Sequence, residues 1–304
     1  MSTARVQAQA KANLTLRVLA REASGFHQIE TLFQRLELAD VTTVREAPSR
    51  TLDVSFGDAE RASDLGPVEQ NLAWRAADAY AAVAGWPRGF AIEIEKWIPV
   101  GGGLGGGSAD AAAVLRALDA LAPRPLGPSA LVDIAARLGA DVAFLVSPSE
   151  LAIAWGRGER LLDLPPLAAA PVLLVVPTFG VNTAAAYGAL AAHRAEHPTA
   201  AGAAWRSPRD LGSWSAVAAD AVNDFEPVIF DQHPELAQVR AQLAALPRSV
   251  FARMSGSGST LFAVQEFGIS VPPPKESGPG VLALPAGWSM VMTRTAPAAP
   301  VELG

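Results

Sequence analysis

A glycine-rich run is the part of this 304-residue sequence best suited to chemistry. It is Pro99-Val-Gly-Gly-Gly-Leu-Gly-Gly-Gly-Ser-Ala-Asp110, with glycine at every position from Gly101 to Gly107 except one. Without Cβ atoms, successive backbone amides can approach a ligand closely and point at it together. Ser108 is predicted to begin a helix, whose free N–H groups and positive dipole end add to that field. The run therefore predicts a phosphate site, and the patterned segments on both sides disfavour a flexible linker.

Two familiar phosphate-binding motifs do not describe this run. A P-loop would end in Gly-Lys followed by Ser or Thr, and the run does not end that way. The acidic residue that a dinucleotide-binding fold places on the ribose is not evident either. A second glycine-rich loop, Arg253-Met-Ser-Gly-Ser-Gly-Ser-Thr260, precedes a predicted strand. Alone, the second loop fits phosphate binding or a simple turn equally. The presence of the first loop favours phosphate binding.

Lysine is scarce in this chain, which draws attention to the positions that carry it. Of the 24 basic residues, only Lys11, Lys96 and Lys275 are lysines. A compact ammonium acts as a point charge on a phosphate or near a reacting hydroxyl, a role that arginine does not copy. Chance accounts for Lys275 in a loop rich in Pro and Gly. Lys11 and Lys96 lie within or beside motifs, so we treat both as candidates for phosphate chemistry.

Two further polar positions each keep two interpretations. Asp141, in Gly-Ala-Asp-Val, follows the end of a predicted helix. Its carboxylate either caps the next turn or points into a cleft, and the local sequence favours neither. Lys11 and Asn13 point to the same side of a predicted strand because side chains alternate along strands. They form either an exposed edge or a polar site.

Composition excludes several classes of function. The chain has no cysteine, which rules out disulfides, thiolate metal sites and cysteine nucleophiles. A net charge of −6 disfavours partners such as nucleic acid or an anionic membrane. The first residues lack the pattern of a signal peptide, and no apolar stretch approaches the length of a membrane span. We expect a cytoplasmic enzyme.

Strands and helices alternate irregularly, which favours an α+β fold over a parallel α/β sheet. The predicted strands cover 6–19 with a break near 12–13, then 29–38, 51–56, 90–96, 171–176, 259–264 and 288–293. The predicted helices cover 71–84, 108–121, 129–138, 183–192 and 235–246, with a hairpin at 151–162. We expect a surface loop at 271–279 and a frayed tail at 296–304.

Together the motifs resemble the GHMP kinase superfamily, in order from about residue 6 to residue 295. The matching segments are Lys11-Ala-Asn13, Gly25-Phe-His27, the glycine-rich run, Gly139-Ala-Asp141-Val, Gly156-Arg-Gly-Glu159, Asn223-Asp-Phe-Glu226-Pro and Met254-Ser-Gly-Ser-Gly258. The resemblance implies an N-terminal domain (1–165) like a ribosomal-protein α/β sandwich. It also implies a smaller ferredoxin-like C-terminal domain (166–304), with the active site in the cleft between the two.

The resemblance implies transfer of the γ-phosphoryl group of ATP, with Mg²⁺, to an alcohol. Lys11 and Asp141 correspond to the catalytic pair of the family, and Asn13 helps to seat the substrate. The positions that correspond to nucleotide contacts are Asn71, Lys96, Pro99, Gly101, Gly102, Gly103, Leu104, Gly105, Gly106, Gly107 and Ser108. The magnesium ligands are not assigned. Ala109 departs from the family pattern because a second serine often stands there.

The resemblance also implies that the alcohol carries a cytidylyl group. Phe26, His27 and Tyr187 correspond to the cytosine site, although Phe26 stands where tyrosine is common. We expect a monomer or weak homodimer that binds a small molecule and neither nucleic acid nor membrane. One rival is a GHMP kinase for homoserine or a mevalonate-type compound. The other is a nucleotide-binding regulatory protein without catalysis, which the presence of both Lys11 and Asp141 disfavours.

Overall fold

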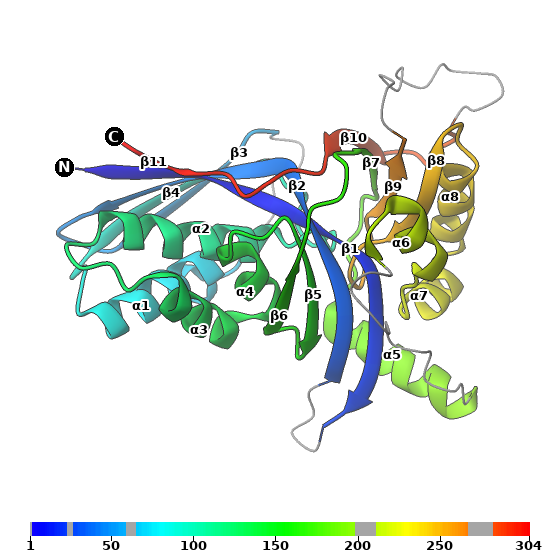
Figure 1. Cartoon of the computed structure of the whole chain (residues 1–304), viewed down its shortest axis with the longest axis horizontal. Coiled ribbons are helices and arrows are strands. Elements are labelled where there is room, and N and C mark those ends of the chain that lie inside the picture. Colours follow the sequence, from blue (N-terminus) through cyan, green and yellow to red (C-terminus); the bar gives the residue numbers. More distant parts are fainter. Residues whose placement is uncertain (1, 23–26, 59–64, 198–210, 267–281) are drawn as a thin grey trace.

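A computed structural model describes residues 2–22, 27–58, 65–197, 211–266 and 282–304 (Figure 1). The strands are β1 (Thr3–Arg21), β2 (His27–Glu46), β3 (Thr51–Phe56), β4 (Phe90–Lys96), β5 (Leu151–Gly156), β6 (Arg160–Leu164), β7 (Pro171–Val176), β8 (Ser249–Met254), β9 (Leu261–Gln265), β10 (Ser289–Arg294) and β11 (Val301–Leu303). The helices are α1 (Leu72–Ala84), α2 (Gly106–Leu121), α3 (Pro128–Leu138), α4 (Ala140–Val146), α5 (Thr183–Glu196), α6 (Trp214–Asp220), α7 (Glu226–Gln232) and α8 (Pro234–Ala244).

The first sheet carries the N-terminal half of the chain. Its strands follow the order β11-β1-β2-β4-β3, with β5 beside β2 and β6 beside β5. Helices α1 to α4 lie on one face of this sheet (Figure 1). The buried side chains of α2 include a run of alanines, which are short enough to let the helix lie close to β1 and β2. This close approach brings the start of α2, and the glycine-rich loop before it, to the central strands.

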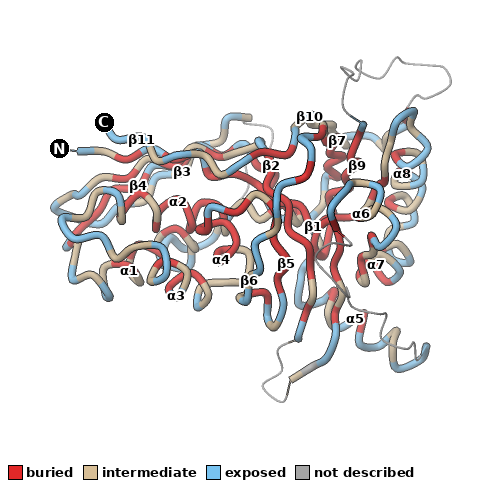
Figure 2. Tube along the Cα trace, viewed as in Figure 1, coloured by how far each residue is buried: buried red, intermediate tan, exposed pale blue. Residues whose placement is uncertain are grey.

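The second sheet is antiparallel, in the order β10-β7-β9-β8, and has its own core with α5, α7 and α8. The outer part of the β1–β2 hairpin extends to it, because Leu16, Val18 and Ile29 pack in this second core. Buried stretches of β1, β2, β7 and β9 stand out in Figure 2. The mixed fold is α+β, as predicted, and one long hairpin contributes to both of its cores.

Two predictions along the chain are wrong. First, β1 does not break at Ala12–Asn13 but pairs with β2 through this stretch, with register shifts between Gln9 and Lys11 and between Asn13 and Thr15. Such irregularities change the direction of nearby side chains, here at two candidate site residues. Second, the C-terminal tail is not frayed, because β11 pairs with β1. The amide of Gln9 also donates to the backbone oxygen of Pro297, 2.9 Å away.

Short helices and strand β8 are further differences from the sequence-based prediction, which placed no strand at 249–254. Helices α4, α6 and α7, each seven residues long, were not predicted, because so few residues show no helical periodicity. Helix α4 matters most for function because Asp141 lies in its first turn. The predicted loop at 271–279 lies outside the described residues.

Candidate active site

The glycine-rich run forms an ordered loop that leads directly into α2. Gly101, Gly103 and Gly105 have φ angles of +72°, +78° and +75°, a region that side-chain-bearing residues rarely adopt. Gly105 is the N-cap of α2, so the helix begins at Gly106, two residues before the predicted start at Ser108. These backbone angles explain why glycine recurs, and they exclude the interpretation of the run as a flexible linker.

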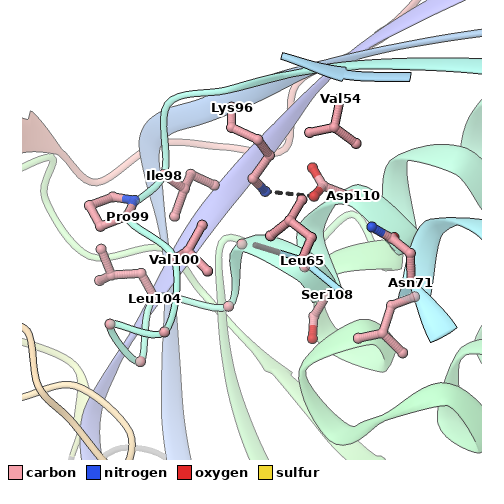
Figure 3. Close-up of a pocket in the computed structure, with 17 residues that line it drawn as sticks. Val54, Leu65, Asn71, Lys96, Ile98, Pro99, Val100, Leu104, Ser108 and Asp110 are labelled. Carbon is pink, nitrogen blue, oxygen red and sulfur yellow. Dashed lines mark hydrogen bonds and ion pairs between the residues drawn. The ribbon is translucent and has the colours of Figure 1, made fainter. Parts of the chain in front are cut away.

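A cavity of about 270 Å³ lies over this loop (Figure 3). All eleven predicted nucleotide positions line it, together with the apolar side chains of Val54, Leu65, Leu72 and Ile98. Asn71 contributes an amide whose oxygen also caps α1 by accepting from the Ala73 N–H. Apolar walls beside a loop of glycines suit a ligand that has a flat apolar part and an anionic part. A nucleoside phosphate has this chemistry.

Ser108 and Ala109 have different environments. Ser108 lines the cavity, whereas Ala109 is buried in the core that α2 forms with the sheet. A serine at position 109 would therefore not line the described cavity. The departure of Ala109 from the family pattern leaves the cavity wall itself unchanged.

Lys11 and Asp141 meet beside the loop. The Lys11 Nζ lies 3.3 Å from Oδ2 of Asp141 and donates to Oδ1 of Asn13 at 2.5 Å and to the Gly103 oxygen at 3.0 Å. The Lys11 side chain is 3% exposed and that of Asp141 is 30% exposed. A Cβ built on Gly105 would lie 3.1 Å from Cε of Lys11 and 3.5 Å from Oδ2 of Asp141. The cation, the carboxylate and the glycine loop thus form one group, and Asp141 points toward it.

The second glycine-rich loop supports the first. The Ser255 hydroxyl donates to the Gly103 oxygen at 2.8 Å and accepts from the Asn13 N–H at 3.3 Å. The Thr260 N–H donates to the Gly102 oxygen at 3.1 Å. Arg253, a candidate for phosphate binding, donates instead to backbone oxygens of residues 221 and 252. These contacts favour a structural role for this loop, which the sequence left open.

Lys96 lies in the cavity wall between two buried carboxylates. Its Nζ donates to Asp110 at 2.6 Å and to Asp40 at a shorter distance, and Figure 3 shows the Lys96 and Asp110 side chains pointing toward each other. The other oxygen of Asp40 accepts from the N–H groups of Trp97 and Ile98 at 2.5 and 2.7 Å. Sequence patterns did not identify Asp40 or Asp110 as partners, because 56 residues separate Asp40 from Lys96.

Burial controls the titration of this cluster. It raises the pKa of Asp110 to about 7, an effect that the charge of Lys96 opposes and the charge of Asp40 reinforces. Burial also disfavours the charged form of Lys96, but attraction to Asp110 and Asp40 outweighs this effect and raises the pKa of Lys96. The second oxygen of Asp110, Oδ1, is buried without a hydrogen-bond partner.

The structure brings together two of the three residues of the predicted cytosine site. The rings of His27 and Tyr187 are stacked, with centroids 4.4 Å apart and an interplanar angle of 12°. Tyr187 comes from α5 and also contacts the ring of Phe225 edge-on at 4.9 Å. Burial raises the pKa of Tyr187, and the charge of Asp141 adds to this effect. Phe26 lies outside the described residues. His27 covers the face of Tyr187, whereas the prediction placed it at the edge of a bound base.

Two negative findings apply to the described part of the chain. Its acidic and histidine side chains form no group of three or more that could hold a metal ion. None of its helices combines the length and apolarity that crossing a membrane requires.

Comparisons with known proteins agree with this geometry. The models for the GHMP kinases N terminal domain and the GHMP kinases C terminal match residues 71–148 and 202–266. A 4-diphosphocytidyl-2-C-methyl-D-erythritol kinase of Pelotomaculum thermopropionicum is 38% identical over 257 residues, which cover 84% of this chain and 87% of that protein. A crystal structure of 4-(cytidine 5'-diphospho)-2C-methyl-D-erythritol kinase matches with a TM-score of 0.68 and 37% identity, covering 86% and 89% of the two chains. A homoserine kinase from Cytophaga hutchinsonii matches with a TM-score of 0.64 at 16% identity, covering 99% and 97%, and shares the fold.

Proposed function

The chain belongs to the family of 4-diphosphocytidyl-2-C-methyl-D-erythritol kinases, and from this premise we propose that Lys11 and Asp141 carry its phosphoryl transfer. The reaction is the ATP-dependent phosphorylation of the 2-hydroxyl of cytidylyl methylerythritol, in the non-mevalonate route to isopentenyl diphosphate. The observation that supports the assignment is the ion pair between the two residues, directly beside Gly105 of the phosphate loop.

The proposed step divides its work between these two side chains. The substrate hydroxyl oxygen attacks the γ-phosphorus, the bond to the bridging oxygen of ADP breaks, and the hydroxyl proton passes to Asp141. The loose transition state releases this proton late, so a carboxylate suffices as its acceptor. The Lys11 ammonium offsets the charge that develops on the transferred group. Backbone amides of Gly101–Ser108 hold the triphosphate. The other residues of the site then mainly position the substrate hydroxyl for attack.

The donor set fits Mg²⁺ that is bound mostly by the nucleotide. Because the described residues offer no cluster of acidic ligands, triphosphate oxygens and water would supply most of the coordination. We propose the hydroxyl of Ser108, which lines the cavity, as the ligand from the chain. Bound there, the ion would neutralise negative charge on the phosphates.

We propose that the cytosine ring stacks on Tyr187 and that His27 reads its polar edge. The present stack shows that this face of Tyr187 accepts a flat ring. For the base to occupy that face, the His27 ring must move to the edge, where its nitrogens can hydrogen-bond. Stacking tolerates any base, so discrimination against uracil would come from His27.

An assay of ATP consumption over a panel of alcohols tests this function. Cytidylyl methylerythritol should support turnover, and homoserine and mevalonate should not. Tyr187→Ala should raise KM for the cytidylyl substrate by roughly 5- to 150-fold, from about 1–3 kcal/mol of stacking, and leave KM for ATP unchanged. His27→Ala should reduce the preference for cytidylyl over uridylyl substrate. Equal use of both by the unmodified enzyme would refute the cytosine site, and ATP binding without turnover would favour the regulatory rival.

We make three further proposals, on the domain division, the cellular location and the oligomeric state. We propose a division into domains at residues 165 and 166, supported by the two separate sheets, although β11 returns to the first sheet. We also propose a cytoplasmic location and a monomer or weak homodimer. Light scattering over a range of protein concentrations would measure the mass of the particle directly.

A further inference from the structure

Arg35 is the largest fully buried side chain among the described residues, and it contacts no substrate pocket described above. Its guanidinium donates to backbone oxygens at the C-terminal end of α4 and just beyond. The partners are Ser149 at 3.1 Å, Ser147 at 2.9 Å, Phe144 at 3.3 Å and Leu145 at 3.4 Å. No acidic side chain of the described residues lies within 4.0 Å of it. A buried cation without a carboxylate in direct contact is costly, and the charge of Glu150 offsets only part of the burial that lowers the pKa of Arg35.

The location of Arg35 connects it to the proposed catalytic pair. On the β1–β2 ladder Arg35 is the direct partner of Lys11, and Phe33 is the partner of Asn13. Residues opposite each other, or two apart, on a sheet share one face. The register of the two strands thus places Lys11 and Arg35 side by side on one face of the sheet.

Two aromatic rings fill the space between these cations. The Lys11 Nζ lies 5.6 Å from the centre of the Phe33 ring, which stacks on Phe144 at 5.0 Å and 17°. The Arg35 Cζ lies 5.2 Å from the centre of the Phe144 ring. The two stacked rings thus lie between the two cations, with Lys11 against Phe33 and Arg35 against Phe144. Such contacts between a cation and the face of a ring are favourable in a desolvated interior.

Helix α4 is therefore held from two directions. Arg35 binds its terminal carbonyls, of which that of Phe144 also accepts from the N–H and the hydroxyl of Ser147. Phe144 of the same helix is clamped between Phe33 and the guanidinium. Asp141 lies in the first turn of this helix, 3.3 Å from Lys11. A shift of α4 relative to β1 and β2 would change that distance directly.

We propose that Arg35 is a positioning residue for phosphoryl transfer, which fixes α4 against the β1–β2 hairpin and so sets the separation of Lys11 and Asp141. The proposal rests on the proposed roles of Lys11 and Asp141. Arg35 touches neither substrate in this arrangement and acts through Asp141 alone. A displacement of about 1 Å at a reacting group can reduce a rate by roughly 100-fold, so a small tilt of α4 is sufficient for a large effect.

The test compares Arg35→Met with Arg116→Met. Arg116 is a partly buried arginine that donates to a backbone oxygen, that of Ala299, but it belongs to α2 and holds the C-terminal tail. Its like charge disfavours the Arg35 cation, so its removal should leave the contacts of Arg35 in place. Both variants should lower Tm. Only Arg35→Met should lower kcat, on the order of 10- to 100-fold, with KM for ATP unchanged, measured well below the Tm of each variant. Equal kcat losses in both variants, or none in either, would overturn the proposal.

A double-mutant cycle separates positioning from general destabilisation. In an Asp141→Asn background, Arg35→Met should reduce kcat no further, because the group that it positions is already gone. A full additional loss would mean that Arg35 acts elsewhere and would refute the inference. If Asp141→Asn alone kept near-normal turnover, the proposed function would fail, whereas an inactive Asp141→Asn beside a fully active Arg35→Met would reject only the role of Arg35.

A conservative variant keeps the test valid if Arg35→Met does not fold. Arg35→Lys retains a donor and a charge but cannot reproduce the planar fork that binds several carbonyls. Its kcat should lie between those of the unmodified enzyme and the catalytic variants, again with KM for ATP unchanged. A kcat equal to that of the unmodified enzyme, together with a lower Tm, would show that Arg35 is purely structural.

Discussion

Two buried lysines flank the same glycine-rich loop, and the structure holds them in opposite ways. Lys96 lies between Asp40 and Asp110, whose side chains are 0% and 4% exposed. Lys11 has one carboxylate, Asp141, whose side chain is 30% exposed, and its other partners are neutral oxygens. Lys96 thus has two buried carboxyl groups as partners, while the single carboxylate beside Lys11 remains accessible.

On the proposed roles, this difference separates a structural lysine from a reactive one. Asp40 binds Lys96 with one oxygen and the amides of Trp97 and Ile98 with the other, so the cluster fixes the chain where β4 enters the loop. A Lys96 charge that two carboxylates already satisfy has little left for a phosphate. The Lys11 ammonium lies against Gly105 and can respond to charge that appears during the reaction. Scarcity of lysine identified both positions but did not distinguish their roles.

The largest effect should follow the removal of the reactive pair. Lys11→Ala and Asp141→Ala should each lower kcat on the order of 10²–10⁴-fold, the range of a lost acid, base or charge-stabilising group. ATP binding, measured by calorimetry, should largely survive because the loop amides remain. Lys11→Met, which keeps the side-chain stem, should be as inactive as Lys11→Ala. Near-normal turnover in any of these variants would remove the distinction between the two lysines.

Removal of the structural lysine should instead reduce stability. Lys96→Met leaves two buried carboxylates without their cation, which should lower the free energy of unfolding by about 3–5 kcal/mol. Urea denaturation measures this loss. Lys96→Met combined with Asp110→Asn should recover part of it, because the second change removes one buried charge. If Lys96→Met were fully stable but lost kcat as Lys11→Ala does, Lys96 would belong with the reactive group.

Neighbouring glycines allow the comparison within one loop. A Cβ at Gly105 would meet Lys11, and one at Gly106 would lie 3.4 Å from Nζ of Lys96. Gly105→Ala also places a side chain at φ +75°, a strain of roughly 1–3 kcal/mol that should lower the free energy of unfolding, and the displacement of Lys11 by the new Cβ should lower kcat. Gly106→Ala should change mainly KM for ATP. Gly107→Ala, whose Cβ would lie 3.9 Å from its nearest protein neighbour, is the matched control for stability, and because Gly107 lines the cavity any effect should be on KM for ATP and not on kcat. Equal kcat losses at Gly105 and Gly106 would contradict this ranking.

The sequence was informative where function constrains the backbone and less so where distant segments meet. Alternating positive φ angles require glycine, so the loop was visible as a run. The contact of Lys96 with Asp40 and the support from Ser255 span 56 and 152 residues, which no local pattern contains. Asp141 kept two interpretations because α4 is too short to show periodicity. The role of the tail was missed for a similar reason, since β11 is three residues long and pairs with the opposite end of the chain.

The smallest effect concerns the pH dependence of the structural cluster. Burial raises the pKa of Asp110 from its ordinary 3.8 to about 7 in the folded protein. Between these values the folded protein binds a proton that the unfolded chain has released. The free energy of unfolding that Asp110 contributes is therefore fully present below the unfolded pKa and is lost as the pH rises through about 7.

Asp110→Asn isolates this contribution from the other carboxyl groups of the protein. The amide keeps an acceptor for Lys96 but cannot titrate, so the difference in Tm between the unmodified protein and the variant should decrease steadily from pH 4 to pH 7, roughly the interval between the two pKa values. Above pH 7 the difference should level off. A difference that stays constant across this range would mean that Asp110 is ionised throughout, and Lys96 would then face two full negative charges. A large fall in kcat for Asp110→Asn at neutral pH would instead place the cluster in the reaction and end the separation of the two lysines.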